Sequence, residues 1–341
     1  MPYAQLRAVL TADLVIRAPN HLGDLVLSLP ALHAAGEADV VVRAWLAPLL
    51  DLAALPGRVV PLGRGSGGFV RCARALRRRG YGRGVLLTPA FSAALLFAAA
   101  GVRQRRGTDT DGRGPLLTER VTRAHTNGLH RAASYLMLVT GATPAEPAAP
   151  RLPVPGVLRD RFADLVPGAP AGPLIGLFPG SKASARRWSA DRFRELGARL
   201  AAEGARVAVF GAAGERALTA HVAGGAALDL GGRTDLPLLA AGLAACDLLV
   251  TNDSGPLHLA AAVGTPTVSL WGAGDPAVTG PLGPGHKLVR HAELPCVPCV
   301  QNRCPRRGSG TVLPDARREC LELVTVAEVE AAVRQQLTVH S

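Results

Sequence analysis

TNDSGPLHLAAAVGTPTVSLWG, residues 251–272, follows the apolar run CDLLV of residues 246–250 and joins a polar turn to an alanine-rich run and a second apolar run. The two apolar runs predict buried strands, and the alanine-rich run, which starts near Gly255, predicts a helix between them. A strand, a helix and another strand in this order form a parallel pair with a crossover helix. We therefore expect a parallel α/β sheet, with the polar residues of the turn lying where the first strand ends.

The same alternation of apolar runs and amphipathic runs extends along both halves of the chain. Strands are expected at residues 13–19, 39–45, 58–62 and 84–90, and again at residues 174–180, 206–214, 227–232, 247–253 and 265–272. Helices are expected at residues 91–102 and 130–142, from about Ser189, Leu236 and Gly255, and at residues 325–337, which open on the capping-box pair Thr325 and Glu328. Near-continuous apolar strands that alternate with helices indicate parallel sheets covered on both faces. The expected fold class is α/β, with two doubly wound domains.

Two domains also suit a chain of 341 residues, of which 48% are hydrophobic. Eight prolines fall between residues 144 and 173 and mark a boundary. We expect a first domain over residues 1–150, a proline-rich linker over residues 151–173 and a second domain over residues 174–341. Folds of this kind bind ligands beyond the carboxyl ends of their strands and in clefts between domains. The site is therefore expected in a cleft between the two domains.

The chain is strongly basic, with a formal net charge of +12 and a pI of about 10.6. Nearly all of its cations are arginine, because lysine occurs only at positions 182 and 287. Aromatic residues, which stack on bases, make up only 4% of the chain, and the basic clusters at residues 71–83 and 102–106 fit solvated faces. These features argue against a nucleic-acid partner. An anionic small-molecule donor or an anionic membrane surface fits the charge instead.

The sequence shows no membrane-spanning pattern. Its most apolar stretch, residues 91–102, is too short to cross a bilayer and fits a buried helix. The first 20 residues lack the basic region, apolar core and cleavage site of a secretory signal. We expect a soluble cytoplasmic protein, and peripheral contact with the inner face of the plasma membrane stays open as an alternative.

The polar turn after residue 250 has the composition of an anion-binding site. Asp253, Ser254 and Gly255 lie at the expected strand end and helix start, where exposed N–H groups and the helix dipole attract anions. Glycine also lets a phosphate approach the backbone closely. A simpler alternative is that the turn only caps the helix. A binding site accounts better for the whole set, which also contains Asn252 and His258.

Two further junctions between a strand and a helix carry polar residues. In RAPNHLGDLVLSLPAL, residues 17–32, Asp24 leads into an apolar helix, where it acts either as a cleft carboxylate or as a first-turn acid favoured by the dipole. In residues 176–200 a strand ends in Pro-Gly-Ser, and the loop that follows holds Lys182, Arg186 and Arg187. Cations at a strand end suit a pyrophosphate, although a basic surface loop has the same composition.

Three segments in this order resemble one known family. They are PNHLGDLVLSLPAL (19–32), FPGSKASARRWSADRFRELGARL (178–200) and VTNDSGPLHLAAAVGTPTVSLWGAGDP (250–276). Together they resemble glycosyltransferase family 9, the ADP-heptose:lipopolysaccharide heptosyltransferases. The resemblance covers nearly the whole chain, although residues 45–125 add little to it. It implies a GT-B fold, in which two Rossmann-like domains face each other across a cleft, with the acceptor side in the first domain and the nucleotide-sugar donor in the second.

The resemblance also implies an activity and a set of partners. The activity is inverting, metal-independent transfer of a heptose or a related sugar from an ADP-sugar to a hydroxyl of a cell-envelope glycan such as lipopolysaccharide core. The partners are the ADP-sugar donor and a glycan or glycolipid acceptor, with no cofactor, no metal and no nucleic acid. The physical chemistry agrees, because backbone N–H groups and cationic side chains can stabilise a departing diphosphate without a metal.

The resemblance assigns site residues in both domains. Asp24 matches the general base that deprotonates the acceptor hydroxyl, and Asn20, His21 and Gly23 lie with it on the acceptor side. The residues on the donor side are Ser181, Lys182, Arg186, Asn252, Asp253, Ser254, Gly255 and His258. The family usually has lysine at the basic position before the tryptophan, where this chain has Arg186. Arginine differs from lysine in shape and hydrogen bonding, so the donor contacts should differ in detail.

Other functions were weighed against this one. Gly63-x-Gly65-x-x-Gly68 matches the dinucleotide fingerprint of a dehydrogenase, but no acidic residue occurs between Asp51 and Asp109 to bind a ribose. A glycine-rich turn explains it better. A GT-B transferase with another nucleotide sugar and a secondary-metabolite acceptor, a GT-B-like nucleotide-sugar epimerase and an inactive sugar-nucleotide binder remain as alternatives. The Asp-x-Asp sequence at residues 109–111, which could suggest a metal-dependent transferase, lies in a loop away from these junctions.

The six cysteines fall into two groups. Cys72 and Cys246 lie in helical patterns and are expected to be inert core residues. The second group is Cys296, Cys299, Cys304 and Cys320, whose spacing is not the paired C-x-x-C pattern of a zinc site. Zinc, a disulfide and free thiols all remain open for this group. We favour a structural role without a metal.

Overall fold

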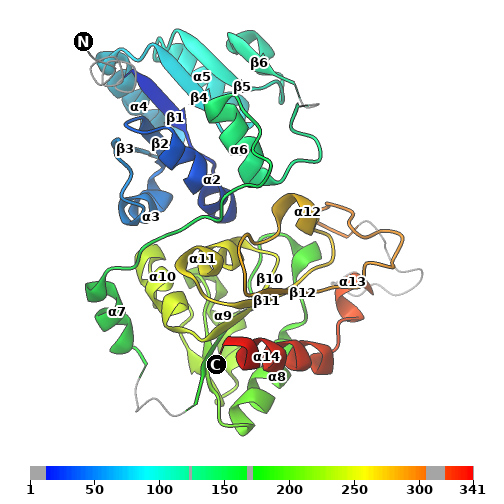
Figure 1. Ribbon diagram of the computed structural model, residues 1–341. Coiled ribbons are helices and arrows are strands. Elements are labelled where there is room, and N and C mark those ends of the chain that lie inside the picture. Colours follow the sequence, from blue (N-terminus) through cyan, green and yellow to red (C-terminus); the bar gives the residue numbers. More distant parts are fainter. Residues whose placement is uncertain (1–12, 123–124, 167–171, 305–318, 341) are drawn as a thin grey trace. The chain divides into compact units, whose positions relative to one another are not determined.

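The computed structural model describes residues 13–122, 125–166, 172–304 and 319–340. The chain divides into two compact units, which we call the N-terminal unit (Met1–Arg151) and the C-terminal unit (Leu152–Ser341). Each unit contains a six-stranded parallel sheet with helices packed on it (Figure 1). The α/β class and the two doubly wound sheets predicted from the sequence are confirmed.

The sheet of the N-terminal unit has the strand order β3-β2-β1-β4-β5-β6. Its strands are β1 (Leu14–Arg17), β2 (Asp39–Arg43), β3 (Val59–Leu62), β4 (Arg83–Leu86), β5 (Gln104–Thr108) and β6 (Glu119–Val121). Its helices are α2 (Leu22–Ala34), η1 (Ala44–Leu46), α3 (Ala47–Leu52), α4 (Gly65–Arg79), α5 (Phe91–Ala99), η2 (Gly114–Leu116) and α6 (Arg131–Thr140). Starting from β1, the chain adds β2 and β3 on one side and then β4, β5 and β6 on the other, so the strand order switches between β1 and β4. Sheets of this kind bind ligands at such a switch point.

The sheet of the C-terminal unit has the order β12-β11-β10-β7-β8-β9. Its strands are β7 (Leu174–Phe178), β8 (Arg206–Val209), β9 (Leu228–Asp229), β10 (Leu248–Asn252), β11 (Thr267–Leu270) and β12 (His286–Val289). Its helices are α7 (Gly156–Ala163), η4 (Ser184–Arg186), α8 (Ala190–Ala202), η5 (Ala213–Glu215), α9 (Arg216–Ala223), α10 (Leu236–Ala245), α11 (Gly255–Val263), α12 (Pro276–Thr279), α13 (Glu319–Glu322) and α14 (Val326–His340). Its order repeats that of the first sheet, with the switch point between β7 and β10.

The central strands form where the sequence has unbroken apolar runs. All residues of β7, β10 and β11 are buried, and their side chains share a core with α8 and α14. The closing helix α14 begins as predicted, because Glu328 N–H donates to Thr325 Oγ1 (3.2 Å) and Thr325 N–H donates to Glu328 Oε2 (2.7 Å). This reciprocal pair is the predicted capping box.

Three strands escaped the sequence analysis, namely β5, β6 and β12. β5 reads QRRGT, so no apolar run marks it. Its arginines are satisfied locally, since Arg105 Nε donates to Leu116 O (2.6 Å) and Arg106 pairs with Glu119. β6 and β12 are short edge strands, which need only one apolar face.

Part of the proline-rich stretch at residues 151–173 is helical, whereas a linker was expected there. Helix α7 buries Leu158 and Phe162, and Phe162 packs so closely on α10 that a β-carbon at Gly242 would lie 2.5 Å from its ring. Residues 167–171 of the expected linker lie outside the described residues. Among the described residues, no helix combines the length and the apolar character needed to span a bilayer.

Candidate functional site

The carboxyl ends of β7, β10 and β11 lie side by side in the C-terminal unit, because these strands are neighbours in its sheet. Three polar segments follow them: the loop 179–188, the turn 252–255 and the turn 271–274. We call this region the donor edge. It contains the residues that the sequence analysis assigned to the donor, except His258, which lies one turn into α11.

Asn252, the last residue of β10, holds the loop 179–188 in place. Its side chain is fully buried. Its Oδ1 accepts a hydrogen bond from the backbone N–H of Trp188 (2.9 Å), and its Nδ2 donates to the carbonyl of Pro179 (2.7 Å). Both ends of the loop are thereby fixed to the sheet. Asn252 therefore holds the loop in place, and both polar atoms of its side chain are hydrogen-bonded to the backbone.

Asp253 and Arg186 form an ion pair between the β10 turn and the loop. Asp253 is 3% exposed, and its Oδ2 lies 2.9 Å from Arg186 Nη1. Burial raises the pKa of Asp253 to about 6, and the Arg186 charge acts in the opposite direction. Gly274 leaves room for this carboxylate, because a β-carbon there would overlap Asp253 Oδ2. The pair thus fixes Arg186 at the donor edge.

The turn does not serve only to cap α11. Ser254 is the N-cap residue, but its side chain forms no capping hydrogen bond and its Oγ lies 3.4 Å from Thr251 Oγ1. Gly255 starts the helix, and the buried His258 lies one turn further along. The alternative of a simple cap therefore lacks its defining contact.

The remaining loop residues play different parts. Ser181 is buried, and its carbonyl accepts a hydrogen bond from Arg187 Nε (2.6 Å). Arg187 is therefore bound to its own loop, and both Lys182 and Arg187 are exposed. Lys182 and Arg186 are the two cations of this loop that the sequence analysis assigned to the donor.

Glu215 is a candidate that the sequence analysis missed. It lies after β8, and its Oε2 accepts a hydrogen bond from the backbone N–H of Ala212 (2.9 Å). A β-carbon at Gly180 would overlap its carboxylate, so Glu215 lies against the start of the loop 179–188. A carboxylate here could accept hydrogen bonds from ligand hydroxyls. The available signal was the sequence GAAGE (211–215), in which Glu215 directly follows the predicted strand 206–214.

In the N-terminal unit, Asp24 lies in the first turn of α2, close to the switch point. The buried Tyr135 of α6 donates a hydrogen bond from its hydroxyl to Asp24 Oδ1 (3.0 Å), and Arg131 Nε lies 3.9 Å from the same oxygen. Burial, with a contribution from the Asp24 charge, raises the pKa of Tyr135 well above its ordinary value. Tyr135 therefore remains a hydrogen-bond donor, and the 32% exposed side chain of Asp24 stays accessible.

The other acceptor-side residues line the start of α2. Asn20 Oδ1 accepts a hydrogen bond from Arg17, and its Nδ2 donates to Thr88 Oγ1 (3.1 Å), so it links the ends of β1 and β4. Arg17 is buried, which lowers its pKa to about 10 and leaves it charged at neutral pH. His21 is exposed and Gly23 is buried. Asn20 thus shapes the junction in the way that Asn252 shapes the donor edge.

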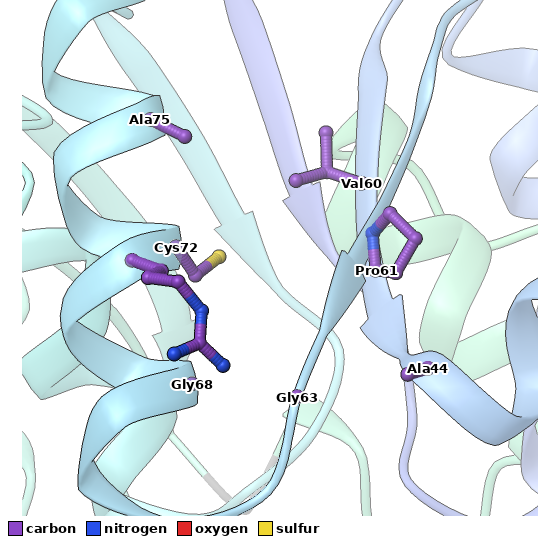
Figure 2. A pocket seen from close by; sticks show the side chains of 8 residues that line it. Ala44, Val60, Pro61, Gly63, Gly68, Cys72 and Ala75 are labelled. Carbon is purple, nitrogen blue, oxygen red and sulfur yellow. The ribbon is translucent and has the colours of Figure 1, made fainter.

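The glycine-rich turn at residues 63–68 has a packing explanation. A β-carbon at Gly68 would lie 2.5 Å from the carbonyl of Gly63, so only glycine allows α4 to start this close to β3. Figure 2 shows the pocket beside this turn, which has a volume of about 370 Å³. Cys72 and Ala44 are among its lining residues. The turn belongs to the third strand of the unit, as expected from the sequence.

All six cysteines are free thiols. The four late ones are half-buried, and burial, together with the neighbouring thiols of Cys296, Cys304 and Cys299, raises the pKa of Cys320. Their segment packs on the end of β11: Val300 N–H donates to Ala273 O (2.7 Å), and Cys320 Sγ lies 2.6 Å from where a β-carbon of Gly272 would be. Within the described ranges, no three His, Cys, Asp or Glu side chains are arranged to hold a metal ion.

Comparisons with known proteins identify this architecture. The family model described as glycosyltransferase family 9 (heptosyltransferase) matches residues 69–309. Lipopolysaccharide heptosyltransferase 2 of Salmonella typhimurium is 29% identical over 317 residues, which cover 81% of this chain and 87% of that protein.

Two solved structures are similar as well. The ADP-heptose lipopolysaccharide heptosyltransferase II of E. coli superposes with a TM-score of 0.81 at 24% identity, over 96% of this chain and 98% of that one. The E. coli heptosyltransferase WaaC with ADP-2-deoxy-2-fluoro heptose has a TM-score of 0.68 at 19% identity, over 94% of this chain and 99% of that one. The fold they share with this chain is the GT-B fold of glycosyltransferases. The chain belongs to glycosyltransferase family 9, as its motifs predicted, and is an enzyme of the transferase class rather than a dehydrogenase.

The raised pKa of Asp253 predicts a pH-dependent cost of burying its charge. The folded pKa of about 6 lies above the ordinary value of 3.8, so the folded protein binds the extra proton between these values. Relative to the Asp253→Asn variant, the wild type should lose roughly 2 kcal/mol of unfolding free energy as the pH rises from 4 to 6, a few tenths more by pH 7, and nothing further above that. Urea unfolding of both proteins from pH 4 to pH 8 measures this difference. A difference that stays constant across this range would contradict the assignment.

Gly274→Ala should disrupt the same carboxylate. The added methyl group overlaps Asp253 Oδ2, so the carboxylate or the 271–274 turn must move, at a cost of roughly 1–3 kcal/mol in unfolding free energy. Gly156→Ala is a matched control, since a β-carbon at Gly156 meets no atom within 4 Å. Thermal unfolding should show a lower midpoint for the first variant alone. Equal midpoints for the two variants would mean that Gly274 leaves more room than the structure shows.

Proposed function

We propose that this chain is an inverting heptosyltransferase that moves a heptose from ADP-heptose to a hydroxyl of lipopolysaccharide core or a related cell-envelope glycan. The relatives named above support this sugar and this acceptor, and the WaaC structure contains an ADP-heptose analogue. The observation that carries the proposal is the donor edge, where a buried aspartate fixes Arg186 beside the start of α11. We further propose that the reaction takes place on the cytoplasmic side of the membrane that holds the acceptor.

On the donor side, the reaction needs positive charge where the diphosphate leaves. Breaking the bond between the sugar C1 and the phosphate oxygen adds charge to the departing ADP. Arg186 and Lys182 supply cations from the loop 179–188, and the N-terminus of α11 supplies backbone N–H groups and a favourable dipole. Asn252 and Asp253 hold these groups in place before the donor binds. The proposed transfer therefore needs no metal ion.

On the acceptor side, Asp24 is the proposed general base. It takes the proton from the acceptor hydroxyl while the hydroxyl oxygen forms a bond to C1 and ADP departs from the opposite side, which inverts the configuration. Tyr135 occupies Oδ1 of Asp24, so Oδ2 is left to meet the acceptor. Tyr135 is thus a positioning residue, because it touches the base and not the reacting atoms.

Donor binding can be tested separately from transfer. ADP should raise the unfolding temperature of the purified protein without added divalent metal, because a ligand at 100 times its dissociation constant adds about 2.7 kcal/mol of stability. UDP, GDP and NADH should give smaller shifts. A larger shift with UDP or GDP would agree with a glycosyltransferase but contradict ADP-heptose as its donor. A shift with NADH alone would contradict the assignment of the donor edge as the nucleotide-sugar site.

Asp24→Asn should abolish transfer while ADP still binds. Loss of a general base lowers kcat by about 10²- to 10⁴-fold. Asp191→Asn is a matched control, since Asp191 also lies in the first turn of a helix but pairs with His221 in the C-terminal unit. Transfer from ADP-heptose to an isolated core oligosaccharide provides the measurement. Near-normal turnover of the Asp24 variant would remove it from the mechanism.

Tyr135→Phe should lower kcat about tenfold and leave the KM for the donor unchanged. The variant keeps the ring but removes the hydrogen bond to Asp24, and a hydrogen bond to a charged group contributes about 1.5–3 kcal/mol. If Tyr135 had only a structural role, the variant would unfold at a lower temperature and would not show a lower kcat with an unchanged KM. Steady-state kinetics and thermal unfolding on the same preparation distinguish the two.

A further inference from the structure

The N-terminal unit contains a long basic stretch without acidic residues. Residues 52–108 include eleven arginines and no aspartate or glutamate. Several of these arginines are used inside the fold: Arg79 pairs with Asp39, Arg106 pairs with Glu119, and Arg105 donates to the carbonyl of Leu116. Arg71, Arg74, Arg77 and Arg78 of α4 are different, since among the described residues none of them forms an ion pair.

Helices α4 and α5 are neighbours on one face of the sheet. Cys72 and Leu76 of α4 share a hydrophobic core with Ala94 and Phe97 of α5, and Figure 1 shows both helices in the same part of the unit. Their outward residues therefore form one continuous surface. Every residue in it belongs to the N-terminal unit.

The two helices expose different kinds of side chain, basic ones on α4 and apolar ones on α5. On α4 the exposed cations Arg71, Arg74, Arg77 and Arg78 follow helical spacing, so they lie on one side of the helix. On α5 the exposed residues include Phe91, which is 46% exposed, and Leu95, which is 40% exposed and one turn further along. We call these six residues the α4–α5 surface.

We propose that the α4–α5 surface docks the enzyme on an anionic lipid bilayer. Basic side chains next to exposed aromatic and aliphatic ones are typical of proteins that bind at the membrane interface: the cations meet the headgroups and the apolar groups enter the acyl boundary. Nucleic acid would satisfy the arginines but would leave Phe91 and Leu95 without an apolar environment. This inference deepens the proposed function, because a glycolipid acceptor would be held in such a bilayer.

The position of the surface in the unit supports this partner. A helix that follows a parallel strand begins at the carboxyl edge of the sheet, so Phe91 at the start of α5 and Arg71 in the second turn of α4 lie towards that edge. Asp24, in the first turn of α2, lies at the same edge. The surface and the proposed base thus share an edge of the sheet but not a face, because α2 packs with α6 and not with α4 and α5.

The test is sedimentation of the full-length protein with vesicles. The protein should bind vesicles of phosphatidylcholine mixed with phosphatidylglycerol and should bind phosphatidylcholine alone weakly. The double variant Arg74→Gln/Arg78→Gln should lose about 25-fold in vesicle affinity, since each basic residue near an anionic surface contributes about fivefold. The double variant Phe91→Ser/Leu95→Ser should bind but be released by salt, because only the electrostatic part remains.

Arg159→Gln/Arg161→Gln is the control for charge, because both arginines are exposed on α7 of the C-terminal unit. It should bind vesicles like the wild type. Equal losses in the two arginine variants would overturn the proposal, as would the absence of any lipid preference or tighter binding to DNA than to anionic vesicles. ADP-induced stabilisation of the same variants keeps the two proposals apart. Unchanged ADP binding with lost vesicle binding supports the surface, and a protein that binds vesicles but not ADP refutes the donor site alone.

Discussion

The donor edge depends on one buried amide. Asn252 lies at the end of the central strand β10, and its side chain bonds to the backbone at both ends of the loop 179–188. A fully buried amide that lost either partner would leave unsatisfied polar groups, at a cost of about 1–3 kcal/mol each. The loop is secured further along, because Ala185 N–H donates to Asn302 O (3.1 Å) and Trp188 Nε1 donates to Val324 O (2.9 Å). Arg186, which the buried Asp253 holds on this loop, is therefore positioned by the protein and not by the ligand, which is the condition for strong electrostatic stabilisation of the proposed leaving group.

The two units share one topology but present different side chains at the carboxyl edges of their sheets. In both sheets the strand order switches between the two central strands, β1 and β4 or β7 and β10. Both units place an asparagine there: Asn252 is the last residue of β10, and Asn20 follows β1. In the C-terminal unit the asparagine fixes the loop that carries Arg186, whereas in the N-terminal unit the edge presents the carboxylate of Asp24, whose side chain is 32% exposed. The proposed base must be accessible to the acceptor hydroxyl, and the proposed stabilising cation must be held rigidly. The burial of Asp253 against the exposure of Asp24 reflects this difference.

Sequence patterns predicted the parts of this structure that rest on local chemistry. The buried central strands and the α14 capping box were found because apolar runs and cap residues are adjacent in the chain. β5 was not found, since its arginines bond to loops that only the fold brings near. Asn252 was assigned to the donor, but its contacts with Pro179 and Trp188 depend on a loop conformation that no spacing reveals. The Tyr135 contact with Asp24 spans 111 positions, so no local pattern could have shown it.

Composition explains why the chain has so many arginines, and the structure shows which of them have partners in the fold. A compositional bias explains why the cations are arginine and not lysine, and the sequence alone favoured solvated faces for the clusters at residues 71–83 and 102–106. The structure divides these arginines into two sets. One set is engaged in the fold, like Arg105 and Arg106, and the other is exposed on α4 next to Phe91 and Leu95. A bias in composition accounts neither for the absence of acidic partners nor for an exposed phenylalanine beside the cations. An anionic interface with an apolar interior accounts for both, because it stabilises the charges and the exposed apolar groups together.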